Sequence, residues 1–396
     1  MAQAPTDIET TTAARIARWI EQEKRTNVKA KRAGDILPSV DAVTTEWLTD
    51  VVCRNSAGAH VSDFRIEAVS SGTHARHRLH VTYNEAGEKA RLPKTLFTKT
   101  LPTVETRLFV GITGHARTEG RFYTQLRPEL DLEIPLCYQS TVDRESLAAL
   151  HLLEDVVATK GAVFCDYQTY VTREMAEDML DLLAVLHGHF YNDTRLKNDF
   201  KWVVPYVNWF TGGITKFKID HYNDEALTQA ADVIPATLLK RRDQIWPATM
   251  KALQVHKERP HTFLHSDVHI GNWYQTAAGR MGLCDWQCAT KGHWSRDLAY
   301  VLSAGLQIED RRVWEHDLVR RYLDRLQQAC GQRFDFDDSW NLYRQQMFHA
   351  LLMWTPTLCH SEHLPSMQPE AASLAMIERM TAAIDDLDSI GSCNGL

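Results

Sequence analysis

The segments His265-Ser-Asp-Val-His-Ile-Gly-Asn272 and Cys284-Asp285-Trp286-Gln287 determine how this chain is interpreted. Asp267 and Asn272 lie five positions apart on a short segment, so one can accept a proton from a hydroxyl while the amide oxygen of the other holds a metal ion. Asp285 ends an apolar segment and can hold the same ion from a second side. This division of roles is typical of kinase-type phosphoryl transfer, and it predicts a magnesium-nucleotide site.

Other residues extend this predicted site. Lys99 ends the strand-like segment Leu-Phe-Thr-Lys and is expected to contact the α and β phosphates of a nucleotide. Glu119, expected to begin a helix twenty residues later, can hold that lysine by an ion pair. His265 is expected to brace the loop through hydrogen bonds to its backbone, whereas His269 either tunes the metal site or packs beside it.

The spacing of apolar residues changes along the chain and predicts an α+β fold. Residues 1–60 are expected to form a helical extension. Residues 61–156 contain alternating segments at 64–69 and 78–83 and further expected strands at 95–100 and 133–139. They predict a small antiparallel sheet that forms a nucleotide-binding lobe. Residues 157–396 are mainly of helical spacing, which predicts a large helical lobe with the catalytic loop and an acceptor site.

Composition excludes several classes of protein. The chain has 396 residues, a net charge of −7 and no concentrated basic patch, so a general nucleic-acid binder is not expected. No apolar run reaches the ~18 residues of a membrane span. The N-terminus lacks the pattern of a secretory signal, and the eight cysteines form no C-x-x-C pair, which favours the reducing cytoplasm. The sequence leaves the oligomeric state open.

The chain resembles the aminoglycoside phosphotransferase and choline kinase group, and within it the ecdysteroid-kinase-like small-molecule kinases. The matching segments follow the family order from about residue 37 to residue 300. They are Leu-Pro-Ser-Val-Asp-Ala-Val-Thr-Thr-Glu-Trp-Leu (37–48), Leu-Phe-Thr-Lys-Thr-Leu-Pro (96–102), Glu-Gly-Arg-Phe-Tyr (119–123), Leu-Leu-Glu-Asp (152–155), Leu-His-Gly-His-Phe-Tyr (186–191), the two opening segments, and Asp-Leu-Ala-Tyr (297–300).

The resemblance implies a bilobal, protein-kinase-like fold that binds ATP, or GTP, with Mg²⁺ between its lobes. It implies that the base meets the backbone from Glu154 to Val156, and that Asp297 braces the loops from the start of a helix, where a carboxylate suits the positive dipole end. The loop Ser71-Gly72-Thr73 is the expected phosphate loop. This loop departs from the G-x-G-x-x-G pattern because it holds a single glycine.

The expected function is ATP-dependent transfer of a phosphoryl group to a hydroxyl of a small organic molecule. A neutral or partly apolar alcohol is favoured, because the chain is only mildly acidic and its larger lobe is rich in Trp, Leu and Met. An aminoglycoside-type antibiotic kinase is the alternative. Two alternatives come from other classes of protein. A metal-dependent hydrolase would use the alternating His265, Asp267 and His269 as metal ligands. A catalytically silent nucleotide-binding module would usually have lost the base or a metal ligand, and this chain has both.

Overall fold

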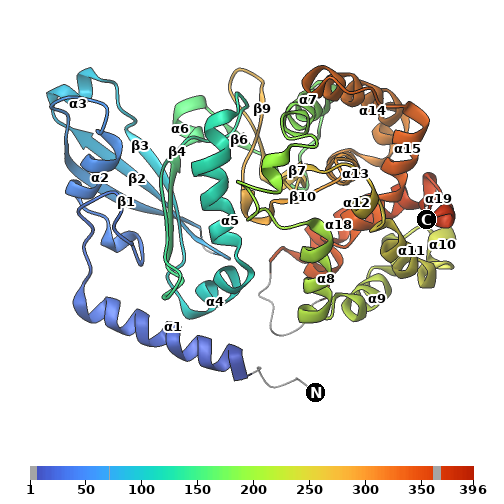
Figure 1. The fold of residues 1–396 in the computed structure, drawn as a ribbon, viewed down its shortest axis with the longest axis horizontal. Coiled ribbons are helices and arrows are strands. Elements are labelled where there is room, and N and C mark those ends of the chain that lie inside the picture. Colours follow the sequence, from blue (N-terminus) through green and yellow to red (C-terminus); the bar gives the residue numbers. More distant parts are fainter. Residues whose placement is uncertain (1–6, 71, 360–366) are drawn as a thin grey trace. The chain divides into compact units, whose positions relative to one another are not determined.

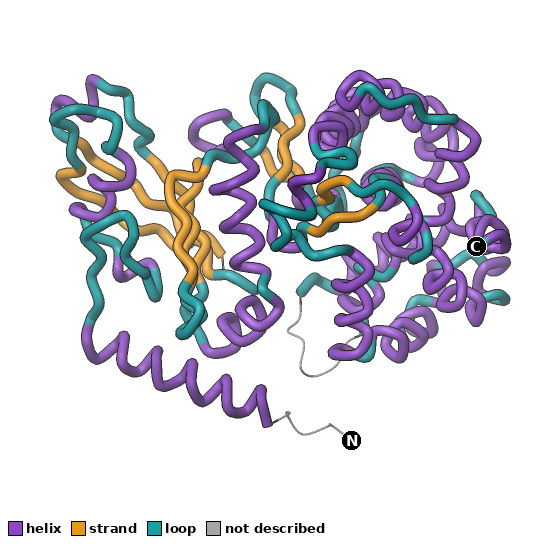
Figure 2. The backbone as a smooth tube through the Cα atoms, in the orientation of Figure 1, coloured by secondary structure: helices purple, strands orange, loops and turns teal. Residues whose placement is uncertain are grey.

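The computed structural model describes residues 7–70, 72–359 and 367–396, and the chain divides into two units, Met1–Ala162 and Val163–Leu396. The first unit holds a five-stranded antiparallel sheet with helices around it. The second unit is mostly helical, and its strands are few and short (Figures 1 and 2).

The sheet of the first unit has the spatial order β1-β2-β3-β5-β4, and each neighbouring pair is antiparallel. Strand β3 is central and pairs Lys99 with Arg76 on one side and with His151 on the other. The lysine is therefore carried by an interior strand of the sheet. The strands are β1 Val61–Ser70, β2 Ala75–Tyr83, β3 Thr95–Thr100, β4 Cys137–Val142 and β5 Ala149–Glu154.

Local hydrogen bonds define where the helices of the first unit begin. Thr44 caps α2 by accepting the backbone N–H of Trp47, and Thr103 forms a reciprocal capping box with Thr106 at the start of α4. The helices are α1 Asp7–Thr26, α2 Thr45–Val52, α3 Glu85–Lys89, α4 Val104–Thr113, α5 His115–Arg121 and α6 Val156–Lys160, with a π-helical turn at Phe122–Leu126.

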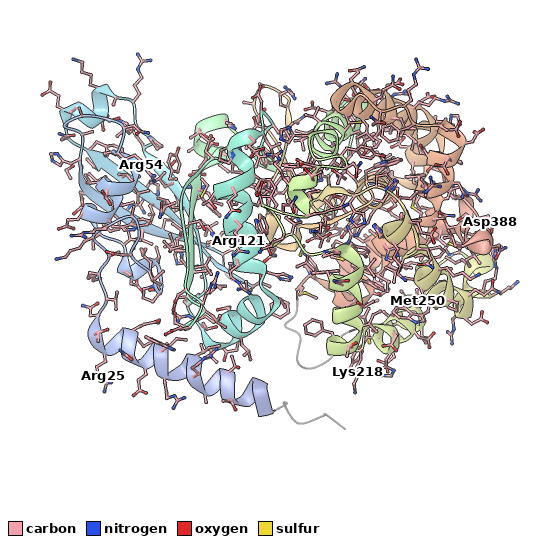
Figure 3. All side chains as sticks on the ribbon, in the orientation of Figure 1. Arg25, Arg54, Arg121, Lys218, Met250 and Asp388 are labelled. Carbon is pink, nitrogen blue, oxygen red and sulfur yellow. The ribbon has the colours of Figure 1, made fainter. Side chains whose placement is uncertain are left out.

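Helix α2 packs on the sheet through an apolar core. Trp47 on α2 and Leu96 on β3 are both fully buried in one cluster. Burying a side chain of this size stabilises a fold by roughly 1.5–3 kcal/mol relative to leaving it exposed. Just after α2, Arg54, which is labelled in Figure 3, donates to the backbone oxygen of Tyr138 at 2.6 Å. Residues before the sheet therefore contribute to the core of the first unit.

A buried arginine fastens α1 to this unit. Arg107 on α4 donates from both terminal nitrogens to the carboxylate of Glu23 on α1, at 2.9 and 2.7 Å. The same guanidinium donates to the backbone oxygens of Leu101, Pro38 and Ser146. Arg107 is 1% exposed. Four separate segments therefore meet at one side chain, and α1 lies along α4 (Figure 1).

In the second unit, α7 and α14 pack side by side. The apolar stripe of α7 includes Met179, Leu183 and Leu186, all buried. The helices are α7 Arg173–His189, α8 Tyr206–Phe217, α9 Ile219–Gln229, α10 Ala236–Leu239, α11 Ile245–Ala252, α12 Val255–Glu258, α13 Ser295–Gly305, α14 Ile308–Cys330, α15 Phe336–Gln345, α16 Met347–Leu351, α17 Thr355–Leu358, α18 Glu370–Asp386 and α19 Ser389–Ser392. Within the described ranges, no helix is both long and apolar enough to cross a membrane.

Five short strands carry the loops of the second unit. Strand β7 pairs with β10, and β8 pairs with both β6 and β9. Strands β7 and β9 therefore pair with other short strands and not with each other. The strands are β6 Val163–Phe164, β7 Thr262–Leu264, β8 Trp273–Gln275, β9 Met281–Leu283 and β10 Thr290–Gly292.

Two details of the sequence interpretation are wrong. Glu119 does not begin a helix, because α5 already begins at His115, after Gly114 ends α4 in the left-handed conformation with φ of 79°. The strand expected over residues 133–139 is β4, which begins at Cys137. Its apolar spacing did not reveal the irregular register between Cys137 and Gln139.

Candidate functional site

The loop from β7 to β8 (residues 265–272, named the catalytic loop here after the role that the sequence predicts for it) is held in a strained backbone conformation. Ser266 has a φ of 69°, in the left-handed region that costs a non-glycine residue about 1–3 kcal/mol. The carboxylate of Asp297 accepts the backbone N–H groups of His265 at 2.8 Å and of Ser266 at 3.2 Å. The hydroxyl of Ser266 also lies 2.6 Å from that of Thr290. These bonds offset the strain and fix the direction of Asp267.

His265 braces this loop as a neutral side chain. Its Nδ1 accepts the backbone N–H of Asp267 at 3.2 Å, so Nε2 carries the proton and donates to the backbone oxygen of Cys284 at 2.9 Å. Burial lowers the pKa of His265 and outweighs the opposite effect of the nearby carboxylates of Asp297, Asp267 and Asp285. A neutral histidine with both nitrogens engaged joins the catalytic loop to the segment that carries Asp285.

Asp267 is oriented from two sides and is partly accessible. Its Oδ1 accepts the hydroxyl proton of Tyr300 at 3.2 Å. Its Oδ2 lies 3.4 Å from Nδ2 of Asn272 and 3.9 Å from Nε2 of His269. The Asp267 side chain is 18% exposed. A carboxylate held this way, with one oxygen on longer contacts, can receive a proton from a bound hydroxyl.

Asn272 and Asp285 are brought together by the β8–β9 hairpin. The backbone N–H of Cys284 donates to the backbone oxygen of Asn272 at 2.9 Å. Asp285 is the next residue and has a φ of 64°. The amide nitrogen of Asn272 donates to the backbone oxygen of Asp267 at 2.7 Å, which leaves its amide oxygen for a cation. A carboxylate and an amide oxygen, completed by phosphates and water, form a donor set that suits Mg²⁺. The residues present therefore fit this ion.

A zinc site is not supported. In the parts of the chain that the structure describes, no three His, Cys, Asp or Glu side chains gather in a way that could hold a metal. His265 and His269 each accept a backbone N–H at Nδ1 and serve the shape of the loop. The hydrolase alternative therefore gains no support from the geometry.

Asp297 lies in the first turn of α13 and stays ionised although it is fully buried. Burial by itself would raise its pKa, but the hydrogen bond with His187 and the positive charge of Arg296 outweigh burial and lower the pKa to about 2. His187 also contacts the hydroxyl of Tyr322 at 2.7 Å. A charged group at this position can hold two backbone N–H groups of the catalytic loop strongly.

In the first unit, the expected ion pair between Lys99 and Glu119 is present. The ammonium nitrogen lies 2.7 and 3.0 Å from the two carboxylate oxygens, and both side chains are almost completely buried. Helix α5 can approach the sheet this closely because residue 120 is glycine. A Cβ there would stand 2.6 Å from Oγ of Ser140 and 3.3 Å from Cε1 of His151.

The expected phosphate loop is described in part, because Ser71 lies outside the described residues. Gly72 and Thr73 lie in the bend between β1 and β2, and the Thr73 hydroxyl is 3.5 Å from Nδ1 of His74. A Cβ at Gly72 would meet only Nη1 of Arg76, at 3.8 Å. The fold itself therefore does not require glycine at this position.

The segment from Glu154 to Val156 links β5 to α6. The Glu154 carboxylate is engaged locally, since it accepts the backbone N–H of Leu136 at 3.1 Å and the hydroxyl of Thr159 at 2.7 Å. The backbone N–H of Val156 is the first of α6 and has no acceptor within the helix. Any contact between this segment and a nucleotide base would therefore come from the backbone.

Sequence reasoning gave no role to Tyr300, which contacts Asp267, or to Trp354, which contacts Tyr300. Tyr300 donates to the Asp267 carboxylate and accepts the indole N–H of Trp354 at 2.8 Å. Tyr300 is one helical turn after Asp297 on α13, so its spacing was a usable signal. Nothing in the sequence pattern indicates Trp354, because its contact is made over a long separation along the chain.

Comparison with known proteins gives a family and a fold. A family model described as the phosphotransferase enzyme family matches residues 113–338, more than half of the chain. No match was found among curated proteins. The structure is similar to choline kinase from Cryptosporidium parvum Iowa II, with a TM-score of 0.51 and 12% identity over 84% of this chain and 92% of that one.

Two further solved structures are similar at lower scores. One is a choline/ethanolamine kinase family protein from Mesorhizobium loti, with a TM-score of 0.47 and 14% identity over 95% of this chain and 100% of that one. The other is an aminoglycoside phosphotransferase from Alicyclobacillus acidocaldarius, with a TM-score of 0.45 and 11% identity over 83% and 93%. The family match and the likeness to the Cryptosporidium structure confirm the expected α+β, protein-kinase-like fold class.

Proposed function

The chain belongs to the phosphotransferase enzyme family, and from this premise we propose that it transfers the γ-phosphoryl group of ATP to a hydroxyl of a small organic molecule. The observation that carries the proposal is the position of Asp267. Its carboxylate is oriented by Tyr300, and it lies beside Asn272, whose amide oxygen is left for a cation. Asp285 follows Cys284, whose backbone N–H donates to the backbone oxygen of Asn272 at 2.9 Å.

In the proposed reaction, the acceptor oxygen bonds to the γ-phosphorus as the bond to the β–γ bridging oxygen breaks. ADP leaves with that electron pair, and the acceptor proton moves to Asp267. Asn272 and Asp285 would hold magnesium, which when bound neutralises phosphate charge. The chain itself contributes positioning and a preorganised environment, which account for most of the rate gain in this class of reaction.

We propose that the first unit also contains nucleotide-binding groups. Lys99, held by Glu119, supplies a positive charge for the α and β phosphates. The bend at Gly72 and Thr73 has room for a close ligand, which supports a role near the phosphates. The backbone from Glu154 to Val156 supplies groups for the base, with ATP preferred in this proposal and GTP as the alternative.

The surroundings of Asp267 favour a neutral or partly apolar acceptor. Its carboxylate accepts the hydroxyl of Tyr300 and lies 3.9 Å from the ring nitrogen Nε2 of His269, and the ring of Trp354 contacts both of those side chains. An aromatic and aliphatic cluster lies in the same unit, with Tyr206 and Phe210 of α8 buried in it and Trp209 packed against it. We therefore propose an alcohol with apolar bulk, as in the ecdysteroid-kinase-like branch that the motifs resemble, acting in the cytoplasm.

The test is a phosphate-transfer screen with magnesium-ATP and alcohols of graded polarity, with aminoglycosides as a separate arm and GTP as a second nucleotide. Formation of a phosphate ester is read by phosphorus NMR and mass spectrometry. The expected result is an ester with an alcohol that carries apolar groups, and none with Asp267→Asn. Transfer to aminoglycosides alone would overturn the proposed acceptor class. Magnesium-ATP binding with no ester from any alcohol would overturn the proposed activity.

A further inference from the structure

Two aromatic side chains form a hydrogen-bonded chain that ends on Asp267. The indole Nε1–H of Trp354 donates to the hydroxyl oxygen of Tyr300 at 2.8 Å. The hydroxyl of Tyr300 donates in turn to Oδ1 of Asp267 at 3.2 Å. Tyr300 is 1% exposed and Trp354 is 3% exposed, so both bonds are shielded from water. We call these three residues the Trp–Tyr–Asp relay.

The direction of the relay is fixed by chemistry. An indole N–H can only donate, so the Tyr300 oxygen must accept from Trp354 and use its single proton on Asp267. A hydroxyl that accepts one hydrogen bond becomes a stronger donor in the next. Trp354 therefore strengthens the hold of Tyr300 on Oδ1 of Asp267 without contacting the carboxylate.

The relay leaves one oxygen of Asp267 for the acceptor. Oδ1 is engaged by Tyr300, whereas among the described residues Oδ2 has the longer contacts of 3.4 Å to Nδ2 of Asn272 and 3.9 Å to Nε2 of His269. The ring of Trp354 also stands edge-on to that of His269, with centroids 5.2 Å apart and an angle of 90°. Trp354 thus supports the catalytic loop at two points.

We propose that Tyr300 and Trp354 are positioning residues that hold Asp267 with Oδ2 toward the acceptor hydroxyl, an inference that rests on the proposed function. In the step, the acceptor O–H proton passes to Oδ2 while its oxygen bonds to the γ-phosphorus and ADP leaves with the electrons of the broken bond. Tyr300 keeps its proton throughout. Trp354 lies beyond the matched residues 113–338, so the relay ties the C-terminal helices to the base.

The kinetic test compares Tyr300→Phe, Trp354→Phe and the double variant with the wild type, using magnesium-ATP and the best acceptor from the screen. Loss of a hydrogen bond to a charged group predicts a kcat about tenfold to a hundredfold lower for Tyr300→Phe, with KM for magnesium-ATP unchanged. Trp354→Phe should lower kcat about threefold. In the double variant, Trp354→Phe should add nothing further, because it acts through Tyr300.

Tyr343→Phe is the matched control. Tyr343 is a fully buried tyrosine of the same unit, and its hydroxyl donates to Oε2 of Glu315 at 3.1 Å. Removing this hydroxyl in Tyr343→Phe should lower the melting temperature about as much as Tyr300→Phe does. It should leave kcat unchanged. A kcat loss in Tyr343→Phe equal to that in Tyr300→Phe, or fully additive losses in the double variant, would overturn the relay.

A second measurement does not depend on turnover. The indole N–H signal of Trp354, identified by its absence in Trp354→Phe, should shift in Tyr300→Phe and in Asp267→Ala but not in Tyr343→Phe. An unmoved signal in Tyr300→Phe would overturn the relay whatever the activity. A shifted signal in a protein that phosphorylates no alcohol would support the hydrogen-bonded chain and overturn the proposed function alone.

Discussion

The two units hold their functional side chains by different physical means. In the first unit, Lys99 and Glu119 sit on a regular strand and a regular helix, and opposite charges hold them together away from water. In the second unit, Asp267 follows a strained backbone at Ser266. The ionised Asp297 holds that backbone by accepting two N–H groups, and the Asp267 carboxylate accepts the neutral hydroxyl of Tyr300. A buried ion pair loses stability when one of its two charges is removed. A loop held by hydrogen bonds loses its conformation when the groups that accept those bonds are protonated or moved.

The largest expected effect comes from removing the base of the second unit. Asp267→Asn should lower phosphoryl transfer about a thousandfold, since it removes a positioned general base while keeping the shape of the side chain. The melting temperature and the affinity for magnesium-ATP should stay near those of the wild type. Rapid-quench transfer assays and calorimetric titration measure these quantities. Ordinary turnover by this variant would remove Asp267 from the proposed reaction.

Breaking the charged pair should instead damage the fold of the first unit. Lys99→Met leaves the carboxylate of Glu119 buried without its lysine, and we expect a loss of about 3 kcal/mol in the free energy of unfolding. Lys99→Met combined with Glu119→Gln should recover part of this stability but none of the activity. Urea unfolding is the measurement. Equal stability of the single and double variants would show that charge does not hold this site.

The second unit should be sensitive to mild acid. Burial lowers the pKa of His256 to about 3 and holds those of His293 and His349 well below 6.5. As pH falls through 6.5, the unfolded chain binds protons that the folded unit does not, so stability decreases. These three groups predict a loss of about 2 kcal/mol between pH 7.5 and 6.0. Urea midpoints that stay constant over this range would contradict the prediction.

The smallest expected effect on stability is at Gly72, and a second glycine of the first unit, Gly120, provides the contrast. Gly72→Ala should change stability by less than about 0.5 kcal/mol, because its Cβ meets only a flexible arginine end at 3.8 Å. KM for magnesium-ATP should rise severalfold if this bend contacts phosphates. Gly120→Ala is the contrasting variant, since its Cβ would press on Ser140 at 2.6 Å and lower the melting temperature. An unchanged KM in Gly72→Ala would place the nucleotide away from the bend.

Parts of this structure follow from local pattern. Strand β3 has the bounds that the sequence predicts, over residues 95–100. The ion pair of Lys99 with Glu119 was foreseeable from spacing and charge. These features depend on residues close together in the sequence or on one pair of opposite charges. Both can be recognised in a single sequence.

Other parts could not be predicted because they depend on contacts far apart in the chain. Strands β8 and β10 have three residues each, too few for a period to appear. The left-handed conformation of Ser266 exists because Asp297 and Thr290 hold it. Trp354 reaches Asp267 only through Tyr300. No local preference in the sequence encodes such arrangements.

The guanidinium of Arg107 has a practical consequence for anyone shortening this polypeptide. Its counter-charge comes from Glu23 on the long opening helix, which from its polar surface resembles a dispensable tail. A version trimmed after that helix would carry a positive group in the interior with its balancing acid deleted. Poor yield or aggregation of such a truncated protein would then reflect the missing acid, and should not be taken as a sign that the remaining residues cannot fold.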